Sequence, residues 1–173
     1  KINALSAITE LRWHMIGHIQ SRKASRVVKC FDFLHSLDSL KLARKLSQIA
    51  QEHERKLPVL MQFNLSGEET KEGWWAVDEH TWAELLPDIA AVLALPNLDV
   101  TGLMTIPPFS QFPEESRPYY LKLRRLQDFL MQQLGTHGLR DLSMGMSNDY
   151  EIAIEEGATW VRIGQAILGP RPS

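Results

Sequence analysis

The feature that most constrains the fold of this chain is a regular alternation of short apolar runs with longer amphipathic segments. Several runs are apolar on both faces, as buried parallel strands are. Six runs are predicted to be strands, at residues 13–17, 31–36, 58–66, 98–107, 140–145 and 159–164. Because each helix must return the chain to the same edge of the sheet, the alternation predicts an α/β fold with a parallel sheet.

The segments between the runs have the apolar spacing of helices. Helices are predicted at residues 21–29, 38–56, 77–95, 114–135 and 148–156, and residues 1–11 are interpreted as the end of a helix that precedes the first strand. Asp38 is predicted to cap the second helix, and Asn148 with Glu151 to form a capping box at the last one.

The length of the chain favours an incomplete barrel. A (β/α)8 TIM-type barrel typically needs ~250 residues, whereas this chain has 173 residues. We therefore expect one domain over residues 1–173 with about six of the eight βα units, the first two missing upstream. An open doubly wound sheet is the alternative architecture. Since a barrel without two strands has unpaired edges, we expect this chain alone to be unstable or to aggregate.

Composition and charge restrict the class of function. Lysine and arginine number 19 against 21 aspartates and glutamates, a formal net charge of −2, which argues against nucleic acid as a partner. No apolar run approaches the ~20 residues of a membrane-spanning helix, so no membrane partner is expected. Cys30 is the single cysteine, and the six histidines lack metal-ligand spacing. We expect a cytoplasmic protein without a metal site.

Two short stretches that contain glycine, residues 143–147 and 162–164, follow the last two predicted strands. If two strands are missing upstream, these are the loops after strands seven and eight, where barrels often bind phosphate. Glycine lets backbone amides approach an anion, and a helix N-terminus offers unpaired N–H groups. Ser147 and Gly164 are therefore candidate phosphate contacts, although each alone is also compatible with a helix cap or a tight turn.

Arg162 lies two residues before Gly164 and is expected to point into the mouth of the barrel. A buried guanidinium needs a polar partner. It would either pair with a carboxylate of the core or face a polar atom of the ligand that carries the phosphate.

Four motifs give the chain a resemblance to a known family. They are WHMIGHIQSRK at 13–23, VLMQFNLSGEETKEG at 59–73, GLMTIP at 102–107 and LSMGMSNDYEIAIEEGATWVRIGQAILGPR at 142–171. Together and in this order they closely resemble the YggS/PROSC family of pyridoxal 5′-phosphate (PLP) homeostasis proteins. That family shares the barrel of the alanine racemase N-terminal domain.

The resemblance implies a barrel that holds PLP at its C-terminal mouth. Ser147 and the backbone near Met146 and Gly164 would bind the phosphate, and Arg162 would meet the pyridine nitrogen. Because arginine keeps its proton, that nitrogen would stay unprotonated and the ring would be a weaker electron sink. This suits a PLP carrier, monomeric when full length and with PLP-requiring apo-enzymes as possible partners, more than an enzyme with substrate turnover.

Some features depart from the family pattern. The family's Schiff-base lysine lies in an AVSKTK-like first strand, which is absent here, so no catalytic residue is assigned. Gln165 stands where the family usually has threonine, so a backbone contact with phosphate is expected from it and a hydroxyl contact is not. Arg22 replaces the commoner asparagine of the QxNK stretch. A group of tryptophans is expected to pack under a loop: Trp74, Trp75 and Trp82.

Two other functions compete with PLP homeostasis. An amino-acid racemase of the alanine racemase type would need a second base, usually a tyrosine. The three tyrosines, Tyr119, Tyr120 and Tyr150, all lie on predicted helices or at their starts. A barrel enzyme for another phosphate ligand would need acids and bases at strand ends. The predicted strand ends have no paired carboxylates and offer only His14, His35, Asn64 and Ser66.

Overall fold

All six predicted strands are present in the computed structural model, which describes residues 10–169. They are parallel, and their order in the sheet, β1-β2-β3-β5-β6-β7, follows the chain. Their bounds are β1 (His14–Met15), β2 (Phe33–Leu37), β3 (Leu57–Asn64), β5 (Leu98–Met104), β6 (Asp141–Met146) and β7 (Trp160–Arg162). A doubly wound sheet reverses its strand order at a switch point. The unbroken order therefore identifies part of a barrel.

One further strand was not predicted. β4 (Trp74–Trp75) pairs in parallel with the end of β3, where Phe63 lies opposite Trp74. It has only two residues, too few for an apolar period.

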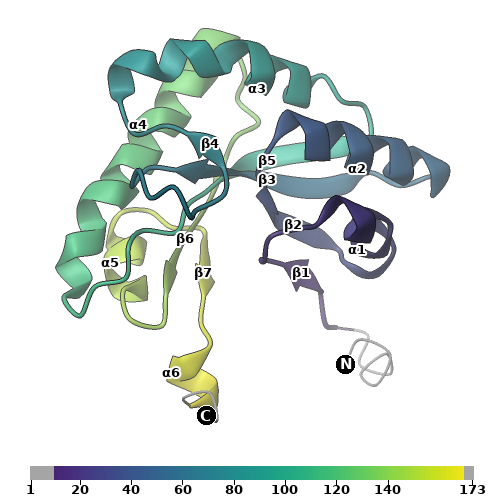
Figure 1. The fold of residues 1–173 in the computed structure, drawn as a ribbon. Coiled ribbons are helices and arrows are strands. Elements are labelled where there is room, and N and C mark those ends of the chain that lie inside the picture. Colours follow the sequence, from purple (N-terminus) through teal and green to yellow (C-terminus); the bar gives the residue numbers. More distant parts are fainter. Residues whose placement is uncertain (1–9, 170–173) are drawn as a thin grey trace.

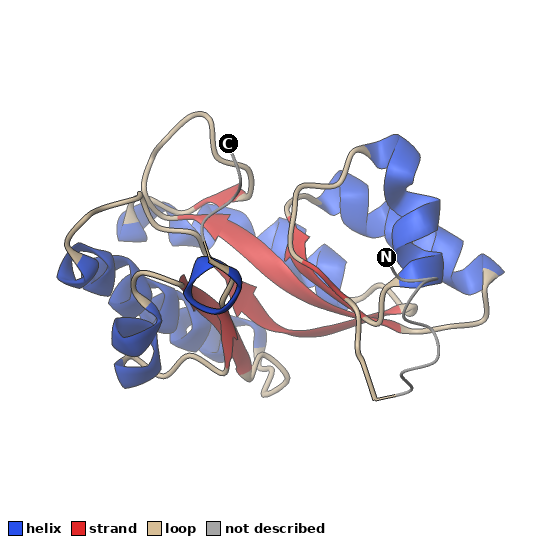
Figure 2. Cartoon of the chain, turned by 90° about the horizontal axis from the view of Figure 1, so that it is seen from below, coloured by secondary structure: helices blue, strands red, loops and turns tan. Residues whose placement is uncertain are grey.

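Helices connect the strands and lie outside the sheet. The 3-10 segments are η2 (Ser21–Lys23), η3 (Glu79–Leu85) and η4 (Pro113–Ser116). The α-helices are α1 (Ala24–Cys30), α2 (Leu40–Glu52), α3 (Leu86–Leu93), α4 (Arg117–Leu134), α5 (Tyr150–Glu155) and α6 (Gln165–Leu168). Consecutive helices from α1 to α5 contact one another, and they lie along the outer side of the sheet in both cartoon views (Figures 1 and 2). Among the described residues, no helix is long and apolar enough to cross a membrane.

Two predicted helix caps are wrong. Ser39, not Asp38, caps α2, because its hydroxyl accepts a hydrogen bond from the backbone N–H of Leu42 at 3.3 Å. The capping box of Asn148 with Glu151 is absent, and Asp149 is the residue before α5. The amide of Asn148 instead donates to the carbonyl oxygen of Ser110 at 2.8 Å, which ties two loops together.

The main hydrophobic core lies between the sheet and the helices. It combines strand residues such as Leu34, Met61 and Leu103 with helix residues such as Leu46 and Leu123, all fully buried. Trp74 and Trp82 are buried as expected, with rings 5.8 Å from Phe63 and 5.7 Å from Phe129. Trp75 is 51% exposed, so the packing prediction fails for it.

The edge strands β1 and β7 approach each other through side chains. Within residues 10–169 they form no ladder with one another. The Trp160 ring on β7 nevertheless lies 5.0 Å from His14 on β1 and 5.6 Å from Phe33 on β2. The space between the two edges is therefore bridged by aromatic rings.

Candidate functional site

The two loops that contain glycine lie side by side at the carboxyl ends of β6 and β7. The Ser147 Oγ atom accepts hydrogen bonds from the backbone N–H groups of Gly164 at 3.0 Å and Ala166 at 3.3 Å. Since a hydroxyl can accept two hydrogen bonds and still donate one, its proton remains available to a ligand. The predicted approach of these loops is confirmed, and Ser147 is the residue that joins them.

Gly145 and Gly164 differ in the space that surrounds them. Gly145 has φ +90°, and a Cβ atom there would lie 2.5 Å from the Cβ of Ala153, so β6 and α5 require glycine at this position. A Cβ atom at Gly164 would meet no protein atom within 4 Å. The position beside Gly164 is therefore not filled by protein atoms.

The backbone N–H of Met146 already has a partner inside the protein. It donates to Asp149 Oδ1 at 2.7 Å, and the other oxygen of this buried carboxylate accepts from the hydroxyls of Tyr120 at 2.6 Å and Ser116 at 2.7 Å. Asp149 thus holds the β6–α5 loop in place. Sequence reasoning missed it, because an aspartate just before a helix has the appearance of an ordinary cap.

The Arg162 side chain points from β7 to the inner side of the curved sheet, as predicted. Its Nη1 donates to Ser143 Oγ at 2.8 Å, and its Nη2 donates to the carbonyl oxygen of Thr105 at 2.9 Å. Burial lowers the pKa of Arg162 to about 10, while the charges of Tyr120 and Asp149 act in the opposite direction. The guanidinium is therefore charged at neutral pH. Neither hydrogen-bond acceptor is a carboxylate, and a guanidinium has further N–H groups to offer a ligand.

Two histidines extend this network across the inside of the sheet. His35 Nδ1 lies 2.8 Å from Ser143 Oγ, and His35 Nε2 lies 2.8 Å from His14 Nδ1. Burial lowers the pKa of His35 to about 3, helped by the neighbouring His14 and Arg162. Burial also lowers the pKa of His14. Both rings are neutral at neutral pH. Their positions at strand ends were visible in the sequence, but their contact was not.

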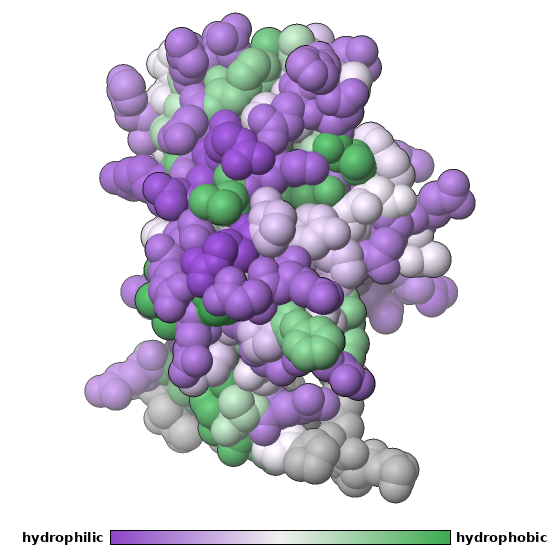
Figure 3. Space-filling view, turned by 90° about the vertical axis from the view of Figure 1, so that its left-hand side faces the viewer, coloured by the Kyte–Doolittle hydropathy of each residue, from purple (hydrophilic) through white to green (hydrophobic). Residues whose placement is uncertain are grey.

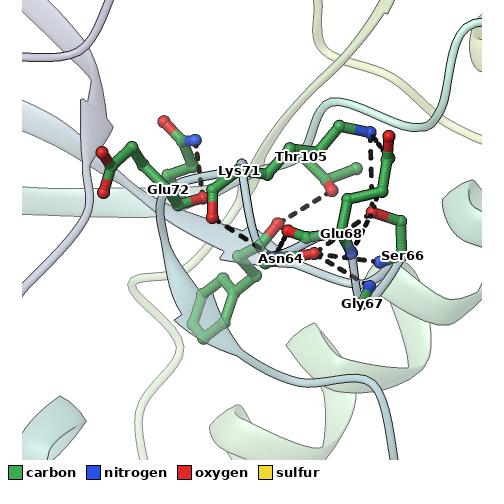
Figure 4. A network of polar contacts seen from close by, with 9 residues as sticks. Asn64, Ser66, Gly67, Glu68, Lys71, Glu72 and Thr105 are labelled. Carbon is green, nitrogen blue, oxygen red and sulfur yellow. Dashed lines mark hydrogen bonds and ion pairs between the residues drawn. The ribbon is translucent and has the colours of Figure 1, made fainter.

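A second part of the mouth is organised by Asn64 at the end of β3 (Figure 4). Its Oδ1 accepts from the backbone N–H groups of Ser66 at 3.2 Å and Gly67 at 3.1 Å. Its Nδ2 donates to the carbonyl oxygens of Glu68 at 2.9 Å and Lys71 at 3.3 Å. One asparagine thus fixes the loop of residues 65–73. The loop helps to line a cavity of about 220 Å³ whose other walls include His18, Gln62 and Ile106.

Three metal-ligating side chains meet beside this cavity. His18 Nδ1 lies 3.0 Å from Asp38 Oδ2 and 3.7 Å from Glu72 Oε1, and the sequence spacing did not predict this group. Asp38 and His18 already form a hydrogen bond, and Lys71 lines the same cavity with a positive charge. These side chains therefore form a polar cluster at the edge of the cavity.

A partial parallel barrel whose last two strand ends are joined through Ser147 is the class of fold that this chain has. The chain belongs to the family described as alanine racemase, N-terminal domain, whose model matches residues 3–172. Within this class it belongs to the pyridoxal phosphate homeostasis proteins. The pyridoxal phosphate homeostasis protein of Aquifex aeolicus is 44% identical over 162 residues, which are 94% of this chain and 68% of that protein.

Two further relatives agree. The pyridoxal phosphate homeostasis protein of Synechocystis is 40% identical over 171 residues, 99% of this chain and 75% of that protein. The solved structure of PipY from Synechococcus elongatus with PLP bound has a TM-score of 0.85 and 34% identity, and the match covers 96% of this chain and 74% of PipY. The fold and the family predicted from the sequence are therefore confirmed.

Proposed function

We propose that this chain binds PLP at the carboxyl ends of β6 and β7 and takes part in PLP homeostasis. The observation that carries the proposal is the junction of the two loops at Ser147, beside the open space at Gly164. The names of the relatives and the PLP bound in PipY support it.

The site residues fit the two polar ends of PLP. The Ser147 hydroxyl and the backbone of Gln165 would bind the phosphate, and Gly164 would contribute through its lack of a side chain and through its N–H, which holds the Ser147 hydroxyl in place. Met146 takes part indirectly, since its backbone N–H is held by Asp149. Arg162 faces the ring nitrogen with N–H groups that Ser143 and Thr105 leave available.

The charge of Arg162 favours a carrier over an enzyme. When bound, PLP supplies an aldehyde that reacts with amines and a ring that withdraws electrons best when its nitrogen is protonated. Arg162 keeps its own proton at neutral pH, so it donates to the ring nitrogen and leaves that nitrogen unprotonated. We therefore assign no substrate turnover and no catalytic residue, and PLP-requiring apo-enzymes are the proposed recipients.

A racemase is the weaker alternative. Tyr120 is fully buried, and burial with its hydrogen bond to Asp149 raises its pKa well above the ordinary value, so it is a poor base. Tyr119 lies on α4, outside the sheet, and the Tyr150 hydroxyl contacts Glu151 on α5. These positions favour the carrier.

We further propose that residues 1–173 act as one PLP-binding barrel domain, incomplete at its N-terminus, in a cytoplasmic protein that is monomeric when full length. The continuous core supports one domain. Within residues 10–169, β1 and β7 each pair with one strand only, which supports further strands at these edges, and the single cysteine suits a reducing compartment.

Equilibrium dialysis with PLP and with pyridoxal, which lacks the phosphate, tests the proposed function. The chain is expected to bind PLP at least about tenfold more tightly than pyridoxal, because hydrogen bonds to a charged group are strong. Ser147→Ala is expected to remove most of this difference. Ser66→Ala is the matched control, because it also removes a serine hydroxyl from the mouth of the barrel, but from the loop that Asn64 holds. Equal binding of PLP and pyridoxal by the unchanged chain would contradict the proposed site.

A further inference from the structure

We infer, on the basis of the proposed function, that Ser143, His35 and His14 are positioning residues. They form a hydrogen-bonded chain with one fixed direction, which orients the Arg162 guanidinium toward the ring of bound PLP.

Arg162 sets the direction of this chain. A guanidinium only donates hydrogen bonds, so Ser143 Oγ accepts from Arg162 Nη1 at 2.8 Å. Ser143 is completely buried. Within residues 10–169 its hydroxyl has one other hydrogen-bond partner, His35 Nδ1 at 2.8 Å. Because a buried hydroxyl proton without an acceptor is costly, this proton points to His35, whose Nδ1 is then the acceptor.

The two imidazoles continue in the same direction. A neutral imidazole carries one proton, and His35 must carry it on Nε2 because its Nδ1 accepts. His35 Nε2 then donates to His14 Nδ1 at 2.8 Å, so His14 also carries its proton on Nε2. This series of hydrogen bonds crosses the inner side of the sheet from β7 through β6 and β2 to β1. Because Arg162 can only donate hydrogen bonds, it determines the tautomers of both histidines.

Packing holds the histidines in place. The His14 ring stacks on Phe33 at 5.1 Å with an interplanar angle of 9°, and Trp160 lies 5.0 Å from His14. The Trp160 ring also meets the edge of His35 at 5.8 Å. Side chains packed between aromatic rings are restricted in rotation. The histidines therefore fix the Ser143 hydroxyl, which in turn fixes Arg162.

Protonation of His35 would interrupt this series of hydrogen bonds. A proton on Nδ1 would turn this nitrogen from an acceptor into a donor, and the buried proton of the Ser143 hydroxyl would lose its acceptor. Burial and the neighbouring charge of Arg162 oppose that proton. The other charged or titratable groups around the chain are His14, with Asp32 and Arg12 near it, and Tyr120 and Asp149 near Arg162. Arg162 is therefore held in one orientation at neutral pH.

Long-range ¹H–¹⁵N NMR of the histidine rings tests the direction of the chain without any ligand. In the unchanged chain, we expect both His14 and His35 as neutral Nε2–H tautomers at neutral pH. In Ser143→Ala, His35 Nδ1 loses its donor, and we expect a change of tautomer or a mixture at His35. A proton on Nδ1 of His35 in the unchanged chain would overturn the inference.

PLP binding tests the consequence for the site. Ser143→Ala is expected to weaken PLP binding about tenfold, since a hydrogen bond to a charged group is lost, while competition by inorganic phosphate is unchanged. Ser36→Ala is the matched control: this buried serine adjoins His35, but its hydroxyl donates to the Gly17 carbonyl oxygen at 2.6 Å. Ser36→Ala should bind PLP as the unchanged chain does.

Failure of the inference and failure of the proposed function give different results. If the unchanged chain does not bind PLP, the proposed function fails. If it binds PLP and Ser143→Ala binds equally well with unchanged histidine tautomers, the positioning role is refuted. If Ser143→Ala does not fold, as judged by its circular dichroism, the tautomers of His14 and His35 in the unchanged protein decide whether the inference holds.

Discussion

Tyr120 on α4 donates a buried hydrogen bond of 2.6 Å to the carboxylate of Asp149, and the same carboxylate holds the backbone N–H of Met146. One side chain therefore connects the helix layer to the loop that contains Ser147. The most direct predictions concern this carboxylate and the buried groups around it.

Replacing Asp149 by alanine should destabilise the fold by about 2–4 kcal/mol, because two buried hydroxyls and a backbone N–H lose their acceptor. Urea unfolding followed by circular dichroism measures the free energy of unfolding. Asp128→Ala is the control, since Asp128 lies exposed on the same helix as Tyr120. Equal stability of the two variants would show that the carboxylate does not hold the loop.

Stability should fall in alkaline solution as Tyr120 loses its proton. Burial, followed by the hydrogen bond to Asp149, raises the pKa of Tyr120 in the folded chain above its ordinary value of 10.0. A raised pKa gives stability that is fully present below the unfolded value and is lost as the pH rises above it. Tyr120→Phe should therefore lose less stability between about pH 9 and pH 11. Urea midpoints across this range measure the effect, and a parallel loss in both proteins would refute it.

Stability should also fall on the acid side because of His35. Its pKa is lowered from 6.5 to about 3 in the folded chain, first by burial. A histidine with a lowered pKa binds its proton more tightly when unfolded, so stability declines as the pH falls below 6.5, by up to about 1.4 kcal/mol per pH unit. His35→Gln should show a smaller decline between pH 6.5 and about pH 4. His137→Gln, at an exposed position, should keep the full slope.

Alanine at Gly145 should lower stability, whereas alanine at Gly164 should weaken PLP binding. Gly145→Ala places a Cβ 2.5 Å from Ala153 at a positive φ, and we expect a loss of about 2 kcal/mol or more. At Gly164 the new methyl meets no protein atom within 4 Å. Gly164→Ala should be the more stable variant and the one that binds PLP weakly, because the methyl occupies the space for the phosphate. Thermal melts and PLP dialysis separate the two effects, and the reverse order of stability would contradict this explanation.

Arg117 should stabilise the contact between α4 and α5 in a salt-dependent way. Its guanidinium binds Glu156 at 2.6 Å and Glu155 at 2.7 Å. Figure 3 shows one side of the molecule, on which hydrophilic residues predominate and hydrophobic patches lie among them. Arg117→Gln should lower the melting temperature, and the difference should shrink at about 1 M NaCl, which screens exposed charges. Arg140→Gln, an exposed arginine before β6, is the control. A difference that persists in high salt would indicate that packing, and not charge, is responsible.

The strands and their order could be predicted because apolar runs and their spacing are local properties of the sequence. The two loops around Ser147 and Gly164 could be predicted for the same reason, since the carboxyl ends of neighbouring parallel strands must meet. The family resemblance then placed Arg162 in the site. Its orientation into the sheet was confirmed, whereas its protein partners, Ser143 and the Thr105 carbonyl oxygen, were not foreseen.

Contacts between distant residues could not be predicted from one sequence. His35 and Ser143 are 108 positions apart, and only the curvature of the sheet brings them together. The caps failed for a similar reason. Asp38 turns toward His18 and Asn148 turns toward Ser110, so tertiary partners displace the local interactions that the sequence pattern favours.

The short helix α6 contributes no buried residue, although it follows directly on the turn at Gly164. Removal of the chain after Ile163 would leave the buried core residues in place and would remove Gly164 and Ala166, the two hydrogen-bond partners of Ser147. The carboxyl-terminal end would then be dispensable for the core, although the proposed phosphate site depends on it.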